Sequence, residues 1–148
     1  MSTYTQILYH IVFPTKDHLP VLADSRRDDL FRYMTGVIKN SQCKPIWTNG
    51  VKDHAHILLS LHPTVALADL LKDIKVASSV WVKEKHAIPN FVDWQEGYGT
   101  ITHFLREQPE LIAYLKGQEE HHRRVTFEEE YRKLLAEAGI EIDERYFP

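Results

Sequence analysis

The sequence contains a single cysteine, Cys43, among its 148 residues. One thiol cannot form an intramolecular disulfide, and it cannot supply the several thiolates of a cysteine-based zinc or iron–sulfur site. The chain also lacks a Gly-x-Gly-x-x-Gly motif, a P-loop and a His-Glu-x-x-His motif. These absences argue against dinucleotide-binding enzymes, P-loop enzymes and zinc proteases of that class.

Long apolar runs are missing as well. No segment approaches the roughly 18 apolar residues of a membrane-spanning helix. The first residues, MSTYTQILYHIVFP, lack the basic stretch that precedes the apolar part of a signal peptide. We therefore expect a cytoplasmic protein without membrane contact.

Neither basic nor acidic residues are in large excess, but the charged residues are unevenly distributed along the chain. The chain has 18 Lys and Arg against 21 Asp and Glu, a net charge of -3. Residues 1–100 carry 11 basic and 10 acidic side chains, whereas residues 101–148 carry 7 and 11, including Glu128, Glu129 and Glu130. The near-neutral main body allows a local basic groove, but a strong non-specific electrostatic DNA binder is not indicated.

Hydrophobic periodicity predicts an α+β fold in one domain, residues 1–148. The strands are expected at residues 4–13, 44–48, 54–61 and 98–104, with Asn49-Gly50 as a turn. The helices are expected at residues 24–41, 64–85, 109–120 and 126–139. The β-α-β-β-α-β order predicts a ferredoxin-like (RRM-like) core at residues 1–104, with a four-stranded antiparallel sheet. Residues 105–148 would add two C-terminal helices.

The segment Asp53-His54-Ala55-His56 is the most informative for chemistry. Side chains alternate along a strand, so His54 and His56 point to the same face. Their Cα atoms lie roughly 6.6 Å apart along a strand, close enough for two imidazoles to converge on one cation. Alternatively, both histidines are polar surface residues on a sheet face left open by the predicted helices.

A second segment, Tyr114-Leu115-Lys116-Gly117-Gln118, carries a phenol and an amide four residues apart. At this spacing Tyr114 and Gln118 share a helix face, while Leu111 and Leu115 can anchor the helix. The pair offers a nucleophile and a neutral oxygen ligand. Taken alone, such a pair is more often a half-buried tyrosine beside a solvated glutamine.

The third segment, Glu119-Glu120-His121-His122-Arg123-Arg124, is less specific. Adjacent histidines on a helix diverge by roughly 100° and do not naturally chelate one ion. We interpret His121 and His122 as part of a solvated turn, in which Arg123 and Arg124 are available for phosphate contact.

These residues together resemble a known family. His54-Ala55-His56 is similar to the His-hydrophobic-His signature of HUH nucleases. The segment from Tyr114 to Gln118 resembles the Tyr-x-x-x-Gln motif of single-tyrosine HUH transposases of bacterial insertion sequences and their REP-associated relatives. Further segments that look like the family run through the chain in order: Tyr9-His10-Ile11-Val12-Phe13, Trp94-Gln95-Glu96-Gly97-Tyr98-Gly99, Gln118-Glu119-Glu120-His121-His122 and Asp143-Glu144-Arg145-Tyr146. Gly117 departs from the pattern, because the family usually has Asn before the Gln.

The resemblance implies a specific activity. Such enzymes cut and rejoin single-stranded DNA at hairpin-containing element ends through a 5′-phosphotyrosine intermediate. Mapped onto this chain, Tyr114 is the nucleophile, and His54, His56 and Gln118 bind Mg²⁺ or Mn²⁺. The ion polarises the phosphate, which suits a neutral phenol that is by itself a weak nucleophile.

The resemblance also implies a homodimer with composite sites. Each site would combine His54 and His56 of one chain with Tyr114 and Gln118 of the other. The alternative hypothesis is a non-catalytic or decayed nucleic-acid-binding dimerisation module on the same fold. An RNA-binding RRM is disfavoured, because that domain carries paired aromatic residues on its central strands, where this chain has His54 and His56.

Overall fold

The computed structural model describes residues 2–22 and 24–147, which form one antiparallel sheet of four strands. The strands are β1 (Leu8–Pro14), β2 (Lys44–Val51), β3 (His54–Ser60) and β4 (Gly99–His103). Their spatial order is β2-β3-β1-β4, so β3 and β1 are central. The predicted α+β, ferredoxin-like fold is confirmed.

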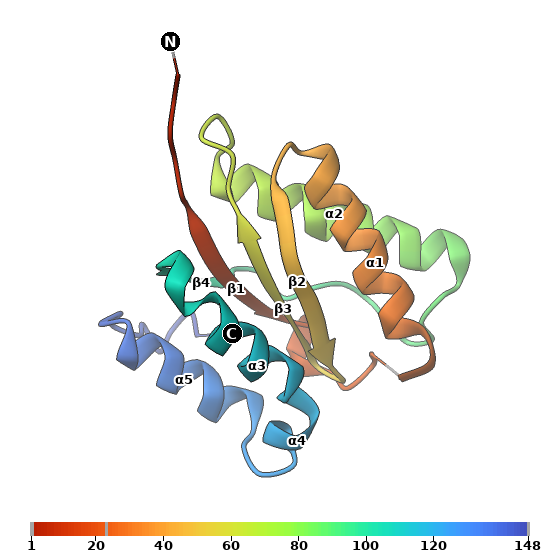
Figure 1. Ribbon diagram of the computed structural model, residues 1–148. Coiled ribbons are helices and arrows are strands. Elements are labelled where there is room, and N and C mark those ends of the chain that lie inside the picture. The colour runs from red at the N-terminus through yellow and green to blue at the C-terminus, as the bar shows by residue number, and fades with distance from the viewer. Residues whose placement is uncertain (1, 23, 148) are drawn as a thin grey trace.

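One face of the sheet carries the main core. Helices α1 (Asp24–Asn40) and α2 (Leu67–Lys85) cover this face (Figure 1). Alternate side chains of the two central strands are fully buried against them: Ile11, Phe13, Ala55, Ile57 and Leu59. The alternation predicted from the sequence is confirmed, and it sends His10, His54 and His56 to the opposite face.

The opposite face is covered too, and the prediction of an open working face is wrong. Helices α3 (Gln108–Lys116), α4 (Gln118–His122) and α5 (Phe127–Glu137) lie over it (Figure 1). Two short 3₁₀ turns, η1 (Lys16–His18) and η2 (Leu105–Glu107), complete the elements of the described residues. Apolar side chains hold this second layer in two clusters, Leu115 with Leu8 and Leu58, and Phe127, Tyr131 and Leu135 with Val12.

The hairpin between β2 and β3 differs from its predicted form. Asn49 and Gly50 are strand residues, and the chain turns at Lys52-Asp53. A Cβ atom on Gly50 would lie 2.3 Å from the backbone oxygen of His54, so only glycine fits this close approach. Asn49 donates through Nδ2 to the backbone oxygen of Leu115 at 2.6 Å, which ties β2 to the C-terminal end of α3.

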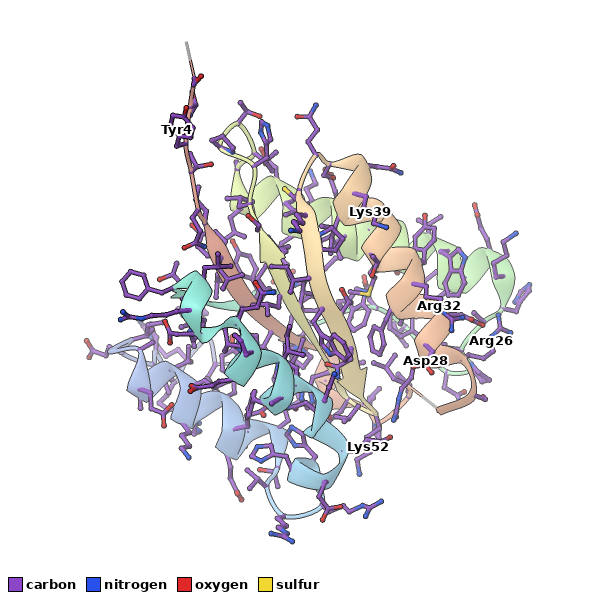
Figure 2. The ribbon with its side chains drawn as sticks, viewed as in Figure 1. Tyr4, Arg26, Asp28, Arg32, Lys39 and Lys52 are labelled. Carbon is purple, nitrogen blue, oxygen red and sulfur yellow. The ribbon has the colours of Figure 1, made fainter. Side chains whose placement is uncertain are left out.

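The chain preceding β1 is not part of the sheet. The strand begins at Leu8 instead of Tyr4, and Tyr4 extends away from the body of the molecule with 91% of its surface exposed (Figure 2). Helix α2 likewise begins at Leu67 instead of Thr64. The last helix has the predicted N-cap, because the Thr126 side chain accepts a hydrogen bond from the backbone N–H of Glu129.

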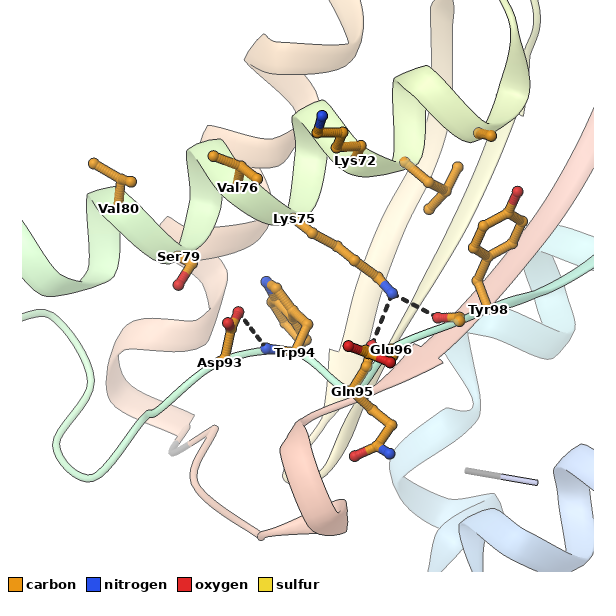
Figure 3. A pocket seen from close by; sticks show the side chains of 13 residues that line it. Lys72, Lys75, Val76, Ser79, Val80, Asp93, Trp94, Gln95, Glu96 and Tyr98 are labelled. Atoms are coloured by element: carbon orange, nitrogen blue, oxygen red, sulfur yellow. Dashed lines mark hydrogen bonds between the residues drawn. The ribbon is translucent and has the colours of Figure 1, made fainter. Parts of the chain in front are cut away.

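The Trp94–Gly99 segment packs against α2, on the face of the sheet that carries the main core. Trp94 is buried and donates through Nε1 to Ser78 Oγ at 2.9 Å. Lys75 Nζ donates to the backbone oxygens of Gln95, at 2.8 Å, and Gly97, at 2.5 Å (Figure 3). The groove of about 570 Å³ at this point lies against α2. Because the site histidines are on the other face of the sheet, this family-like segment serves packing.

No helix formed by the described residues is both long and apolar enough to cross a membrane.

Candidate active site

His54 and His56 lie side by side on β3, as their spacing predicts. Their Nε2 atoms are 3.2 Å apart, and both side chains are fully buried. The expectation that they occupy an exposed face is wrong, because α4 and α5 close over them. A buried pair of imidazoles needs polar partners, and the surrounding helices supply them.

The outer nitrogens of both imidazoles are held by neighbours. His54 Nδ1 lies 2.7 Å from the Asp53 carboxylate, and His56 Nδ1 lies 2.8 Å from His10 Nε2. The rings of His10 and His56 are stacked, with centroids 5.1 Å apart. These contacts fix the ring orientations, so that both Nε2 atoms face the space beneath the C-terminal helices. Such outer partners are typical of metal-binding histidines.

Tyr114 and Gln118 meet at one point, although the helix that was predicted to carry both is interrupted. Gly117 ends α3, and Gln118 begins α4. The Tyr114 hydroxyl donates a short hydrogen bond to Glu130 Oε2, and Gln118 Nε2 donates to the same oxygen at 3.0 Å. The ring centroids of Tyr114 and His56 are 6.3 Å apart. The structure therefore brings all four predicted site residues into one cluster.

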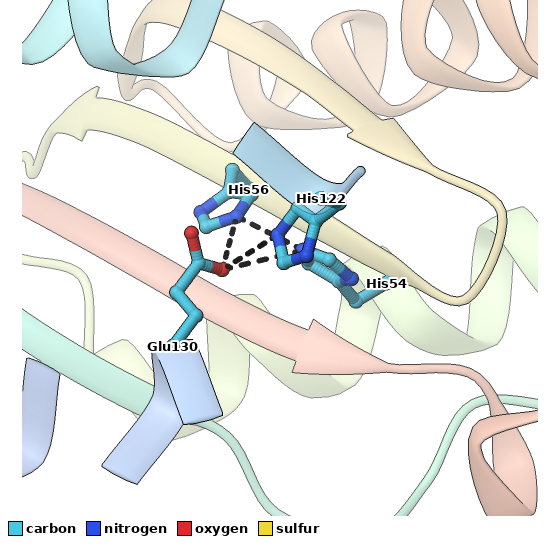
Figure 4. Close-up of side chains that lie close together, drawn as sticks. All are labelled: His54, His56, His122 and Glu130. Carbon is cyan, nitrogen blue, oxygen red and sulfur yellow. Dashed lines mark hydrogen bonds and ion pairs between the residues drawn. The ribbon is translucent and has the colours of Figure 1, made fainter. Parts of the chain in front are cut away.

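Glu130 is the central residue of this cluster, and sequence reasoning missed its role. Its Oε1 atom lies 3.4 Å from His54 Nε2 and 3.2 Å from His56 Nε2 (Figure 4). The glutamate is only 2% exposed. A signal was present in the sequence, because Glu130 is three residues after Phe127 and immediately before Tyr131, on the apolar stripe of α5.

His122 also belongs to the cluster, and its interpretation as a solvated residue is wrong. Its Nε2 atom lies 3.2 Å from Glu130 Oε1 and 2.9 Å from Gln118 Oε1. The spacing of Tyr114, Gln118 and His122 is four residues each time, which places them on one side of the helical segment. His121 contacts the other carboxylate oxygen of Glu130, with its Nε2 atom 3.2 Å from Oε2.

Burial lowers the pKa of the cluster histidines, whereas neighbouring carboxylates raise it. Burial disfavours a charged His54, but its hydrogen bonds to Asp53 and Glu130 outweigh burial and raise its pKa. Burial lowers the pKa of His56, and it lowers the pKa of His10 to about 3. His10 and His56 are therefore neutral near pH 7, with a ring nitrogen lone pair available.

The pKa values of Glu130 and Tyr114 are also shifted from their ordinary values. Burial opposes ionisation of Glu130, yet hydrogen bonds from His122, His54 and His56 hold its pKa far below the usual range. Burial and the adjacent Glu130 carboxylate raise the pKa of Tyr114 above that of an ordinary phenol. The site at rest thus combines an ionised carboxylate with a neutral phenol.

A pocket of about 440 Å³ opens beside the cluster. Asp53 and His122 line it, so it borders the site directly. Lys52, on the turn between β2 and β3 (Figure 2), lines it together with the basic residues Arg27 and Arg123. Glu119 lines it as well and pairs with Arg27, so the opening carries charges of both signs.

Within the described chain, Tyr114 lies beside His54 and His56 of the same chain, and the composite site shared by two chains stays a prediction. Tyr114 lies over the histidines of its own chain, because η2 leads directly from β4 into α3 and the apolar contacts of Leu115 seat that helix on the same sheet. In this arrangement no residue of a second chain is needed to complete the cluster.

The chain matches a known protein family over most of its length. A family model described as "Transposase IS200 like" matches residues 3–118, which include His54, His56, Tyr114 and Gln118. His122 and Glu130 lie beyond the matched range. No curated protein sequence shows a significant match to the chain.

Two solved structures share the fold. A protein from Deinococcus radiodurans R1, provisionally described as a transposase, is 21% identical, with a TM-score of 0.60 over 80% of this chain and 95% of its own. A REP-associated tyrosine transposase bound to a REP hairpin is 14% identical, with a TM-score of 0.59 over 84% of this chain and 76% of its own. With the family match over most of its length, the chain belongs to the IS200-like transposase family.

Proposed function

We propose that the protein cleaves and rejoins single-stranded DNA through a 5′-phosphotyrosine intermediate formed on Tyr114. A divalent ion, Mg²⁺ or Mn²⁺, is bound by His54, His56 and Gln118 in this proposal. The residues fit such an ion, because the buried Nε2 atoms of His54 and His56 lie 3.2 Å apart and the buried Gln118 contacts the same carboxylate as they do. When bound, the ion supplies Lewis-acid polarisation of the scissile phosphate.

One observation carries the proposal: Tyr114 and the two histidines contact opposite oxygens of the same carboxylate. Glu130 Oε2 accepts from the Tyr114 hydroxyl, while Oε1 lies 3.2 Å from His56 Nε2. The phenol oxygen is thus held within a few ångströms of the metal-ligating nitrogens. Nucleophilic attack on a phosphate bound at the histidines requires this proximity.

The reaction conserves the phosphodiester bond. The Tyr114 oxygen forms a bond to phosphorus, the bond between phosphorus and the 3′-oxygen breaks, and the phenol proton is transferred to the departing 3′-oxygen through groups of the site. Rejoining reverses the exchange, with a 3′-hydroxyl attacking the phosphotyrosine. No nucleotide cofactor is needed, because the bond energy is stored in the covalent intermediate.

The substrate in this proposal is a hairpin-containing DNA strand. Support comes from the structurally similar REP-associated transposase, which is bound to a REP hairpin. Lys52 and Arg123 are among the residues that line the pocket beside the cluster, and basic side chains of this kind contact the phosphates of a DNA strand. The homodimer that the resemblance implies is part of the proposal, and sedimentation velocity of the purified chain tests it.

Formation of a covalent adduct is the direct test. The purified protein is incubated with Mn²⁺ or Mg²⁺ and labelled single-stranded oligonucleotides that contain the hairpins flanking its gene. We expect a labelled protein band that survives denaturant in the wild type and in Tyr146→Phe, whose tyrosine is exposed at 78%. Tyr114→Phe should give no such band.

An adduct that persists in Tyr114→Phe contradicts the assignment of the nucleophile. Hairpin binding by the wild type without any adduct, under all metal conditions, favours the alternative function of a non-catalytic DNA-binding module.

A further inference from the structure

The buried cluster contains more potential metal ligands than the three residues in the proposed function. Four atoms approach one another from three elements: Nε2 of His54, Nε2 of His56, Nε2 of His122 and Oε1 of Glu130. All four lie within 4.8 Å of one another, and three of the residues are fully buried or nearly so (Figure 4). His122 and Glu130 come from α4 and α5, beyond the sheet that carries His54 and His56.

Three of these donor separations match those of ligands around one small cation. In a tetrahedral site with bonds of about 2.0–2.1 Å, two donor atoms lie about 3.3–3.4 Å apart. His54 Nε2 and His56 Nε2 are 3.2 Å apart, and Glu130 Oε1 is 3.4 and 3.2 Å from them. These three atoms form a nearly equilateral triangle with the dimensions of one face of such a site. His122 Nε2 adds a fourth donor, 3.2 Å from the carboxylate oxygen.

The partners of the outer nitrogens indicate which ring nitrogen carries the hydrogen. His122 Nδ1 lies 2.8 Å from the backbone oxygen of Val125, and His54 Nδ1 lies 2.7 Å from the Asp53 carboxylate. Both partners can only accept, so each Nδ1 donates. In the neutral imidazoles the Nε2 atoms of both residues then present lone pairs to the interior, as in carboxylate–histidine–metal arrangements.

Acceptor atoms therefore face one another inside the cluster. Gln118 donates through Nε2 to Glu130. The Oε1 atom of Gln118 then lies 2.9 Å from His122 Nε2 and faces its lone pair. With the rings neutral, Glu130 Oε1 would likewise face the lone pairs of His54 and His122, whereas a ring that takes up a proton donates to this oxygen. Such a group of electron donors is stabilised by a cation at its centre, whether a metal ion or protons taken up by the rings.

We propose that His122 and Glu130 ligate the same metal ion as His54 and His56, and that this donor set selects Mn²⁺ or Zn²⁺ over Mg²⁺. Three imidazoles with one carboxylate suit transition metals, whereas Mg²⁺ prefers oxygen ligands and retains its waters. The inference rests on the proposed function, since it concerns the ion used there. It adds that Glu130 links the ion to the nucleophile, with Oε1 on the metal side and Oε2 on the Tyr114 hydroxyl.

Metal binding by the full-length chain tests this inference without any DNA. The protein is stripped with EDTA, dialysed, and titrated calorimetrically with Zn²⁺, Mn²⁺ and Mg²⁺. We expect one site per chain that binds Zn²⁺ and Mn²⁺ at least about tenfold more tightly than Mg²⁺. Glu130→Gln and His122→Gln should each weaken Mn²⁺ binding by about tenfold or more. Glu129→Gln, an exposed neighbour on α5, should bind like the wild type.

Co²⁺ binding gives a second measurement. Its visible absorption is far stronger in a four-coordinate site than in a six-coordinate site, so the wild type should give a strong band that Glu130→Gln reduces. Circular dichroism and a melting curve of each stripped variant show whether it is folded. If one variant unfolds, the other still tests the ligand set.

Two results overturn the inference. One is wild-type affinity for Mn²⁺ in folded Glu130→Gln and His122→Gln proteins, which would leave both residues as partners in a buried ion-pair network. The other is a site that prefers Mg²⁺. Adduct formation distinguishes this failure from failure of the proposed function, because a Tyr114-dependent adduct that persists in both variants upholds the function while rejecting the additional ligands.

Discussion

Tyr114 donates its hydroxyl hydrogen to Glu130, and this contact joins α3 to α5 directly above the histidine pair. The adjacent carboxylate and burial both raise the pKa of the phenol, so Tyr114 is neutral in the resting site. A neutral phenol is a weak nucleophile, which means that the phosphate must be made more electrophilic or the hydroxyl must be released from Glu130 before attack. In the proposed reaction, the neutral Tyr114 phenol therefore needs one of these two changes before it attacks.

Tyr114→Phe should abolish the covalent adduct while the protein stays folded. Tyr114→Phe deletes one hydrogen bond to a buried carboxylate, which still accepts from Gln118. We expect a loss of about 1.5–3 kcal/mol in the free energy of unfolding, because hydrogen bonds to charged groups contribute that much. Urea denaturation measures it, and hairpin affinity should stay within about twofold of the wild type. A fully unfolded variant would contradict this view of Tyr114.

Replacing either histidine should cost both cleavage and stability. His54 and His56 are fully buried, so His54→Ala or His56→Ala leaves a cavity and removes a partner of Glu130. We expect a loss of about 2–4 kcal/mol in the free energy of unfolding in EDTA, together with loss of the covalent adduct. His62→Ala, on the loop after β3, is the control and should change neither by much. Unchanged stability in both site variants would indicate an open face after all.

Part of this site was predictable from short-range rules, and part was not. Strand alternation was sufficient to pair His54 with His56, and helical spacing was sufficient to align Tyr114 with Gln118. Glu130 could not be assigned in the same way, because its position depends on how Phe127 and Tyr131 pack on Val12, a contact across more than one hundred residues. The prediction of an open sheet face failed for the same reason. Whether helices dock on that face depends on contacts between segments far apart in the sequence, and short-range patterns do not specify them.

Acid should destabilise the metal-free protein through its buried neutral histidines. His10 has a pKa of about 3 in the folded chain, against about 6.5 when unfolded, so the unfolded state binds the extra proton between these values. Stability should therefore fall as the pH drops below 6.5, by up to about 1.4 kcal/mol per pH unit from this residue. In His10→Gln the slope of stability against pH should be shallower over this range. Melting curves from pH 7 to pH 5 in EDTA measure the slopes, and equal slopes would reject the assignment.

Glycine at position 99 should be needed for docking of α5. A Cβ atom there would lie 3.0 Å from the Tyr131 ring, so Gly99→Ala pushes on the helix that carries Glu130. We expect a loss of about 1–3 kcal/mol and weaker Mn²⁺ binding. Gly36→Ala on α1 is the matched control. It meets no atom within 4 Å, and alanine in a helix should raise stability by about 0.5–1 kcal/mol. Equal effects of the two substitutions would show that α5 does not press on β4.

The structure completes the candidate site within one chain, and mixed dimers test whether catalysis does the same. A Tyr114→Phe chain and a His56→Ala chain are co-expressed with different tags, and the heterodimer is purified through both.

If Tyr114 acts with the histidines of its own chain, every site in the heterodimer carries one lesion, and we expect no adduct. If the layer of α3 to α5 exchanged between chains, one site would carry both lesions and the other none, so about half of the wild-type adduct would return. An exchange would replace the contacts of Leu115 with Leu8 and Leu58, and of Tyr114 with Glu130, by contacts between the two chains. Recovered activity in the heterodimer would therefore demonstrate a second arrangement of this layer, whereas no recovery supports the arrangement described for a single chain.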